Sequence, residues 1–264
     1  MARRAVEALL DVTADPAAST EEFLERLLAA GRELASARPA MGAVTHAVGR
    51  LVASAHTASH LPPEELQRLV SEEANGLLGS RERAAASIAV HVAPSLRDAL
   101  VLTHSASATV REAVLHTPPA RLFCTVSGPL EEGRGLAEDL RTQGLDVEVV
   151  EDADVAQALE SASLVLVGAD TVYEDGTLKN KVGTRPLLEA AARSGVRTVV
   201  ACEILKLAPI PPPSDEDEPD LRDTTAPDVV DAIVTEEGSV TPEEVRSLID
   251  RTPFLREGYR LLRG

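Results

Sequence analysis

The sequence has little of several things, and each shortage excludes a class of protein. It contains no tryptophan, and aromatic residues make up 2% of its 264 positions, so the core must be built from Leu, Val, Ile and Ala. No stretch approaches the roughly 18 consecutive apolar residues of a membrane-spanning helix. Asp11 and Asp15 interrupt the apolar run that follows Met1 to Arg4, which argues against a cleavable signal. We therefore expect a cytoplasmic protein without membrane contact.

Cysteine and the common cofactor motifs are also scarce. The two cysteines, Cys124 and Cys202, each lie inside an apolar, strand-like run, which favours buried free thiols over a disulfide. They are far apart and have no histidine cluster nearby, so we expect no metal site. The sequence has no phosphate-binding loop, dinucleotide glycine fingerprint or nucleophile elbow. We expect no cofactor.

Basic residues are far fewer than acidic ones, with 26 Lys and Arg against 43 Asp and Glu. The formal net charge is −17, which argues against nucleic acid as a partner, because affinity for a phosphate backbone depends on clustered Lys and Arg. Two explanations of the acidic surface stay open. It could be an adaptation to a salt-rich cytoplasm, or a solubilising surface encoded by a genome that favours Arg and Ala.

Helical patterns fill the first 96 residues. Ser19 and Glu22 form a capping box before an apolar helical repeat, Met41 to Ala58 is a second candidate helix, and Pro62 to Glu65 opens a third. The histidines outside the site considered below are expected at the surface: His46, His56, His60, His91 and His116. We expect an N-terminal helical domain over residues 1–96.

The hydrophobic period changes after residue 96. Short apolar runs rich in β-branched residues predict strands at 99–103, 122–126, 147–150, 164–167, 198–202 and 232–235. Helix-like segments lie between them, at 109–115, 131–143, 154–161 and 184–194. Such alternation is typical of a parallel sheet covered on both faces. Residues 97–264 should therefore form a Rossmann-like, doubly wound and mainly parallel α/β domain.

Polar residues follow the predicted strands where they end. Ligands of doubly wound sheets bind beyond the carboxyl ends of the strands, and the candidates there are Thr103, His104, Ser105, Gly168, Asp170 and Glu203. The chain has three lysines, Lys179, Lys181 and Lys206, and two of them lie beside Asn180 in the segment 168–184. A compact ammonium in an arginine-rich chain suggests an anionic ligand. The alternative is that each polar residue only caps a helix or a turn.

A proline-rich and acidic segment interrupts the second half of the chain. Residues 209–213 contain four prolines and are followed by the run SDEDEPD. Proline removes backbone donors and like charges repel, so this segment should be solvated. It is expected to act as a connector or as a lid over the strand ends.

Five motifs resemble a known family over most of the chain from about Leu96 onward. They are VLTHSASATV, GAD followed by DGTLKNKVGT, ACEILKL, RDTTAPDVV and VTEEGSVTPEEV. The resemblance is to the alpha, beta and delta subunits of translation initiation factor 2B and to the isomerases that share their fold, which act on ribose 1,5-bisphosphate or methylthioribose 1-phosphate. The segment CEILK is similar to the ribose-bisphosphate and initiation-factor branches.

The resemblance implies a reactive pair of Cys and Asp in the isomerases. Asp170 falls at the Asp position, whereas Ser105 stands where the Cys is expected, and a serine hydroxyl is much harder to ionise than a thiol. The enzymes usually carry an Arg before the proline of the motif that is TVSGP here, and Gly128 occupies that place. Losing a bidentate phosphate clamp would weaken binding by roughly 1.5–3 kcal/mol.

Three functional readings follow. In the first, the protein is a non-catalytic, subunit-like member that binds a phosphorylated sugar or nucleotide through Asp170, Asn180, Lys181 and Lys206. In the second it is an aldose-ketose isomerase in which His104 or Ser105 replaces the thiol, although His104 could equally only hydrogen-bond a loop. In the third the chain is a structural partner without a ligand. The resemblance also implies a homodimer or larger homo-oligomer and a possible translation-factor partner.

Overall fold

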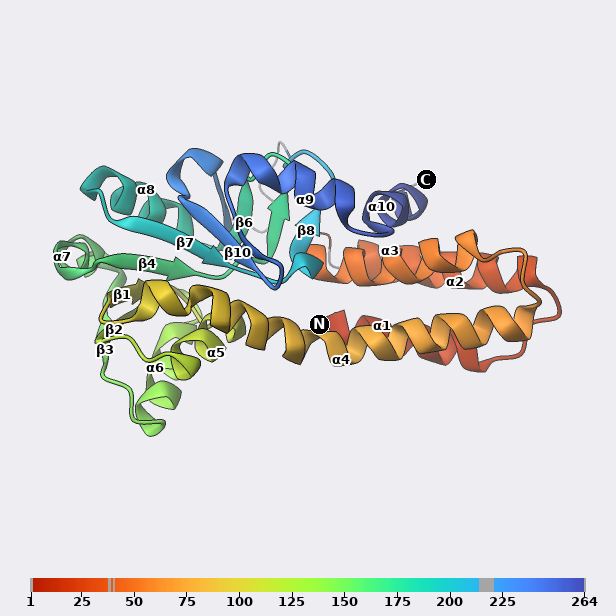
Figure 1. The fold of residues 1–264 in the computed structure, drawn as a ribbon, viewed down its shortest axis with the longest axis horizontal. Helices are drawn as coiled ribbons and strands as arrows, with labels where there is room; N and C mark the ends of the chain where they lie inside the picture. Colours follow the sequence, from red (N-terminus) through yellow and green to blue (C-terminus); the bar gives the residue numbers. More distant parts are fainter. Residues whose placement is uncertain (1, 38, 40, 214–220, 264) are drawn as a thin grey trace.

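The computed structural model describes residues 2–37, 39, 41–213 and 221–263, and helices account for its first part. Four helices lead the chain: α1 (Ala2–Ala14), α2 (Thr20–Ser36), α3 (Gly42–Thr57) and α4 (Pro63–Leu96). The Ser19 side chain caps α2 by accepting the N–H of Glu22 at 3.1 Å, as the sequence predicts. At about 1.5 Å per residue, the 34 residues of α4 span about 50 Å and run from the helical bundle to the sheet (Figure 1).

The second part is a seven-stranded sheet in the order β11-β10-β7-β4-β1-β2-β3. Its strands are β1 (Leu100–Thr103), β2 (Arg121–Thr125), β3 (Val147–Val150), β4 (Leu164–Val167), β7 (Arg197–Ala201), β10 (Ala232–Thr235) and β11 (Gly238–Val240). All neighbours are parallel except the antiparallel β10–β11 pair. The prediction of a mainly parallel α/β fold is confirmed, and the six predicted strands lie within one residue of their observed limits.

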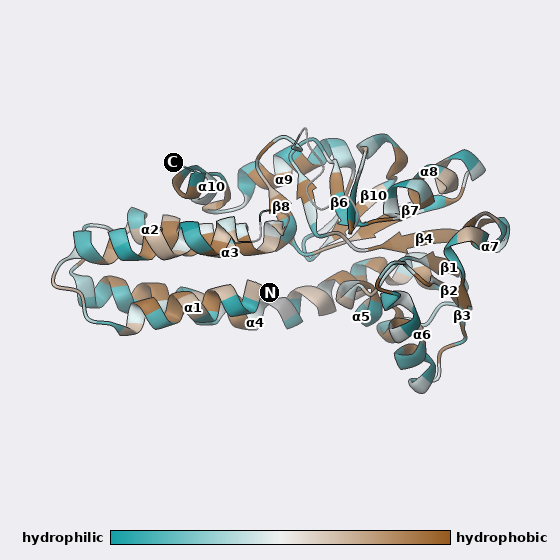
Figure 2. Ribbon diagram, turned by 180° about the vertical axis from the view of Figure 1, so that it is seen from behind, coloured by the Kyte–Doolittle hydropathy of each residue, from teal (hydrophilic) through white to brown (hydrophobic). Residues whose placement is uncertain are grey.

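Helices cover both faces of this sheet, which makes it doubly wound (Figure 1). On one face α4 packs with α5 (Ala108–His116) and α6 (Glu132–Thr142). On the other face lie α7 (Val155–Ser161), α8 (Thr184–Ser194) and α9 (Val245–Arg251). Figure 2 shows the apolar residues gathered along the strands and along the helix faces turned toward them. A third apolar cluster lies among the N-terminal helices.

A second, four-stranded sheet stands beside the first, and the pattern of apolar residues does not predict it. It comprises β5 (Thr171–Tyr173), β6 (Leu178–Lys181), β8 (Leu207–Ala208) and β9 (Arg222–Thr225), in the order β8-β5-β6-β9. Its polar strand β6 reads LKNK yet is buried throughout. Hydrophobicity alone cannot identify such a strand, because its burial depends on polar partners supplied by distant segments.

The last helix, α10 (Leu255–Arg263), returns to the N-terminal helices and packs along α3. Gly258 and Gly49 face each other so closely that a Cβ on Gly258 would lie 2.7 Å from the Cα of Gly49. Leu262 joins the apolar cluster of the helical bundle. The division into two domains at residues 96 and 97 stays a prediction.

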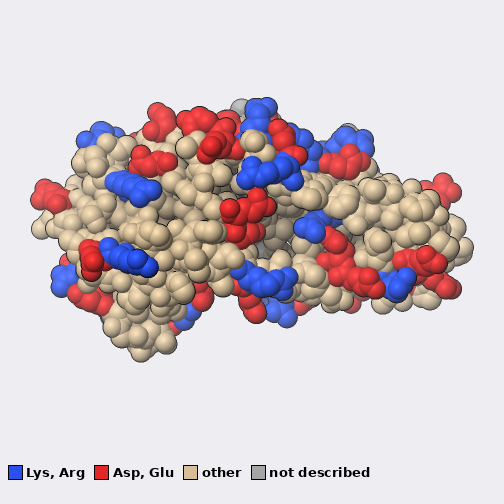
Figure 3. Space-filling model, viewed as in Figure 1, with Lys and Arg blue, Asp and Glu red and all other residues tan. Residues whose placement is uncertain are grey.

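Four short 3-10 turns complete the described chain: η1 (Asp152–Asp154), η2 (Ile204–Lys206), η3 (Pro227–Val229) and η4 (Pro242–Glu244). The acidic half of the predicted lid or connector, residues 214–220, lies outside the described residues. Figure 3 shows acidic and basic side chains interspersed on one face, without a large patch of a single sign. Within the described residues, no helix has the length and apolar character needed to cross a membrane.

His46 corrects one expectation, since it was placed at the surface and is 2% exposed. It lies on α3 with the imidazole against the backbone of Ile204 and Leu205. Burial, assisted by the charge of Arg50, lowers the pKa of His46 to about 4. A neutral imidazole is therefore part of the packing between α3 and η2.

Candidate functional site

A cavity of about 1030 Å³ opens where β1 and β4 end. After β1 the chain continues to β2 and β3 on one side of the sheet, whereas β4, β7 and β10 lie on the other side. The ends of β1 and β4 therefore meet at the switch point of the topology, which is where such sheets bind ligands. Helices α1, α3 and α4 supply the opposite wall, so the cavity lies between the sheet and the helical bundle.

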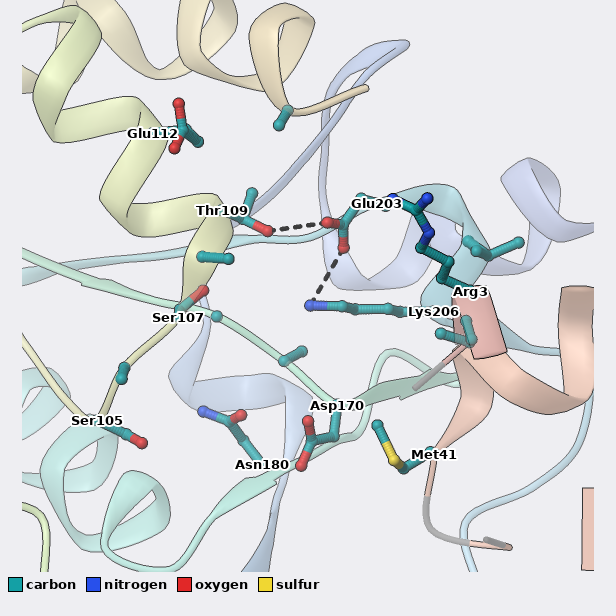
Figure 4. A pocket seen from close by; sticks show the side chains of 18 of the residues that line it. Arg3, Met41, Ser105, Ser107, Thr109, Glu112, Asp170, Asn180, Glu203 and Lys206 are labelled. Carbon is teal, nitrogen blue, oxygen red and sulfur yellow. Dashed lines mark hydrogen bonds and ion pairs between the residues drawn. The ribbon is translucent and has the colours of Figure 1, made fainter. Parts of the chain in front are cut away.

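Most of the residues predicted for the site line this one cavity. They are His104, Ser105, Gly168, Asp170, Asn180, Lys181, Glu203 and Lys206. Thr103 is not among them, because it is the last residue of β1 and its side chain is completely buried in the sheet. Figure 4 shows Ser105, Asn180 and Asp170 along one side of the cavity, with Glu203 and Lys206 across from them.

Ser105 presents a free hydroxyl. Its backbone adopts a left-handed conformation, with φ of 64°, a region that costs a non-glycine residue about 1–3 kcal/mol. The backbone N–H of Ser105 donates to Ser127 Oγ at 2.7 Å, and this bond holds the turn after β1. The Ser105 hydroxyl itself has no hydrogen-bond partner among the described residues. It is directed toward Asn180 and Asp170 (Figure 4).

Asp170 pairs with an arginine that the sequence analysis did not single out. The Nε of Arg222, at the start of β9, lies 2.8 Å from Asp170 Oδ2. The next residue, Asp223, accepts the backbone N–H groups of Gly183 at 2.8 Å and Arg185 at 3.0 Å, and so fixes the start of α8. Both residues belong to RDTTAPDVV, one of the motifs that carry the family resemblance. The motif therefore orients the Asp170 carboxylate through Arg222, and it fixes the turn that follows Lys181 through Asp223.

Each predicted lysine of the cavity is also paired with a carboxylate. Lys206 Nζ lies 3.1 Å from Glu203 Oε2, and the hydroxyl of Thr109 donates to Glu203 Oε1 at 3.1 Å. Burial disfavours the charged form of Glu203, but the Lys206 ammonium and the hydrogen bonds to the carboxylate, including that of Thr109, together outweigh it, so the pKa of Glu203 lies below its usual value. Lys181 Nζ lies 2.7 Å from Glu132 Oε2 on α6, a partner that the sequence analysis did not identify.

His104 is held by the protein through both ring nitrogens. Its Nε2 lies 2.8 Å from the carbonyl oxygen of Val182, and its Nδ1 lies 2.7 Å from Thr125 Oγ1. Because a carbonyl only accepts, Nε2 carries the proton and Nδ1 accepts from Thr125. Burial lowers the pKa of His104 and favours the neutral ring. The geometry matches the alternative in which His104 ties down a loop, here the one that follows Lys181.

The backbone around Gly128 is hydrogen-bonded to a carboxylate of the protein itself. Asp152 accepts the backbone N–H of Ser127 and that of Gly128, both at 2.8 Å. An incoming phosphate would meet neither an arginine side chain nor free amides at this place. The Lys and Arg residues that line the cavity, within the described part of the chain, are Arg3, Lys181, Lys206 and Arg222.

Neither cysteine of the chain lines the cavity, so neither can take the place of the thiol that the resemblance implies at position 105. Cys124 lies in β2 and Cys202 follows β7, and both are free and completely buried. Burial raises the pKa of each thiol to about 12. Within the described part of the chain, no group of three His, Cys, Asp or Glu side chains is arranged to hold a metal ion.

Comparison with known proteins adds sequence and structural relatives. The family model of the Initiation factor 2 subunit family matches residues 1–224. A ribose 1,5-bisphosphate isomerase of Haloferax volcanii is 29% identical over 262 residues, covering 88% of this chain and 80% of that protein. A putative translation initiation factor eIF-2B subunit 2-like protein of Pyrococcus horikoshii is 36% identical over 115 residues, covering 42% of this chain and 41% of that protein.

Solved structures agree with these relatives. The crystal structure of the Pyrococcus horikoshii translation initiation factor eIF-2B superimposes with a TM-score of 0.77 at 25% identity. The match covers 91% of this chain and 90% of that one. The arrangement of a helical bundle on a doubly wound sheet is thus shared over nearly the whole length.

Proposed function

This chain belongs to the Initiation factor 2 subunit family, and from that premise we propose that it binds a phosphorylated sugar and acts as an aldose-ketose isomerase on ribose 1,5-bisphosphate or a related sugar phosphate. The observation that carries the proposal is that Asp170 and the free hydroxyl of Ser105 line one cavity at the switch point of the sheet, together with Asn180, Lys181 and Lys206. The similarity to a ribose 1,5-bisphosphate isomerase over 88% of the chain supports it.

The reaction opens the sugar ring, so that a proton goes to the ring oxygen, and moves one hydrogen from carbon 2 to carbon 1. The hydroxyl on carbon 2 loses its proton and becomes the carbonyl, while the oxygen on carbon 1 keeps its phosphate. Asp170 is the group suited to take and return a proton, because its carboxylate is held in place by Arg222 and faces the cavity. The Ser105 hydroxyl donates a hydrogen bond to the oxygen that gains negative charge. His104 positions the loop of Lys181 and does not act as the base.

Lys181 and Lys206 would bind the phosphate oxygens, and Asn180 would orient the sugar. The amide of Asn180 is itself oriented, since its Nδ2 donates to Thr184 Oγ1 at 3.1 Å. A serine hydroxyl ionises far less readily than a thiol, so turnover should be slow compared with an enzyme that carries cysteine at this position.

A second candidate function is a non-catalytic, subunit-like protein that binds the same class of ligand. Two observations favour it. Ser105 stands where the resemblance to the isomerases implies a thiol, and the backbone N–H groups of Ser127 and Gly128 already donate to the carboxylate of Asp152. Assembly into a homodimer or larger homo-oligomer, and binding of a translation factor, are further proposals drawn from the family.

The test is incubation of the purified protein with ribose 1,5-bisphosphate, with ketose formation followed by NMR. We expect slow turnover that disappears in Asp170→Asn, whereas Asp250→Asn, which removes a surface ion pair with Arg256, leaves it unchanged. Ser105→Cys should raise the rate, and Ser247→Cys on the exposed side of α9 should not.

Binding measured by calorimetry separates the candidates. A wild-type protein that binds the bisphosphate but shows no turnover above buffer would refute the isomerase and leave the non-catalytic candidate. Absence of binding would refute the isomerase and any non-catalytic role that depends on this bisphosphate.

A further inference from the structure

Glu132 is the exposed half of an ion pair inside the cavity. The side chain of Lys181 is 9% exposed, whereas that of Glu132 is 35% exposed. The carboxylate therefore reaches inward from solvent to a largely buried ammonium. Glu132 lies in the first turn of α6, and the residue before it, Glu131, has a left-handed backbone with φ of 54°.

Lys181 is held rigidly while its partner is not. Its carbonyl oxygen accepts the hydroxyl of Thr184 at 2.6 Å, its strand pairs with β9, and His104 fixes the next carbonyl. Glu132 has no other ion pair or hydrogen bond among the described residues. Rotation of one side chain would return its carboxylate to water and leave the ammonium facing the cavity.

Two other carboxylates of the cavity, Asp170 and Glu203, are held differently from Glu132. Asp170 pairs with Arg222 and is the proposed reactive group. Glu203 is 8% exposed and bonded to both Thr109 and Lys206, so it is fixed. Of these three carboxylates, Glu132 is the most exposed and the least restrained.

We propose that Glu132 is a resident counter-ion that an anionic ligand must displace from Lys181. The pair neutralises a buried ammonium when no ligand anion is bound, and a phosphate group competes with Glu132 because two anions cannot share one ammonium without repulsion. Glu132 then sets the affinity of the site and favours doubly charged phosphates over weaker anions. This inference rests on the proposed function, since it assumes that Lys181 contacts the phosphate.

The test compares Glu132→Gln with Glu131→Gln. Both changes remove one negative charge from adjacent positions of α6, but Glu131 pairs with Arg134 on the surface and not with Lys181. Calorimetry with ribose 1,5-bisphosphate, and separately with inorganic phosphate, should show binding at least about five-fold tighter in Glu132→Gln, the lower end of coupling between neighbouring sites. Glu131→Gln should bind as the wild type does.

Two further variants complete the test. Glu132→Ser should tighten binding as Glu132→Gln does, and Glu132→Gln should have no effect when it is combined with Lys181→Met. The inference is overturned if the wild type binds the bisphosphate and Glu132→Gln binds it no more tightly than Glu131→Gln. If neither the wild type nor Glu132→Gln binds either probe, it is the proposed function that fails.

Discussion

Gly168 offers a quantitative test of how the cavity is built. It follows β4 at the switch point, and a Cβ placed on it would lie 2.8 Å from the Cβ of Ser107 and even closer to the Ser107 hydroxyl. Ser107 caps α5, since its Oγ accepts the N–H of Val110 at 3.3 Å. Gly168→Ala should therefore both crowd the turn, at about 1–3 kcal/mol, and disturb the cap, at about 1 kcal/mol.

The free energy of unfolding should fall by roughly 2–4 kcal/mol, the sum of these two effects. Urea denaturation measures it, with a lower midpoint and an unchanged slope. Gly135→Ala is the matched control, because Gly135 lies on the exposed side of α6 with no atom within 4 Å of the added Cβ, and it should stabilise the protein by about 0.5–1 kcal/mol.

A rescue experiment assigns the cause. Ser107→Gly removes the atoms that a Cβ on Gly168 would meet, so combining it with Gly168→Ala should relieve the crowding and leave only the loss of the cap. If Gly168→Ala unfolds at the same urea concentration as the wild type, the close approach of β4 and α5 that defines the cavity wall is wrong.

Three further predictions concern buried groups elsewhere in the chain. In the unfolded chain His46 takes up a proton as the pH falls through its ordinary pKa of 6.5, whereas in the folded protein the buried ring does so only near pH 4. The unfolded state therefore binds the proton first, and about 3 kcal/mol of the free energy of unfolding present above pH 6.5 should be lost as the pH falls to 4. Urea titrations of wild type and His46→Gln at several pH values should differ in that window, and parallel curves would contradict the assignment. The buried thiols of Cys124 and Cys202, whose pKa values burial raises to about 12, should resist a thiol reagent at neutral pH and react in denaturant; rapid labelling of the native protein would show that they are accessible. Gly258→Ala should force α10 away from Gly49 and cost at least about 1–3 kcal/mol, seen as a lower thermal midpoint; an unchanged midpoint would mean that α10 does not pack on α3.

The large sheet could be predicted from the sequence because its strands are short runs of buried apolar residues. The stretch LVLV at 164–167 is such a run, buried at each position. Residue pattern suffices there, since a strand covered on both faces has to be apolar throughout. The family resemblance, found through motifs in the same half of the chain, is confirmed by the family match and by the solved structures.

The site could be predicted only in part. Strand ends such as Ser105 and Asp170 were identifiable because parallel strands end at one edge of a sheet. Their partners were not, since Glu132 and Arg222 lie about fifty residues from Lys181 and Asp170, and no local pattern connects them. Thr103 does not line the cavity although the end of its strand is predicted correctly, because alternate residues of a strand point to opposite faces of the sheet and the sequence does not show which face a side chain takes.

The return of α10 to α3 has a consequence for the way the chain is made. Phe23, Leu27 and Val48 belong to an apolar cluster that Leu262 completes, so the first helices to leave the ribosome keep part of their apolar surface uncovered until translation has reached α10. During that interval they would be open to chaperones and to contacts with neighbouring nascent chains.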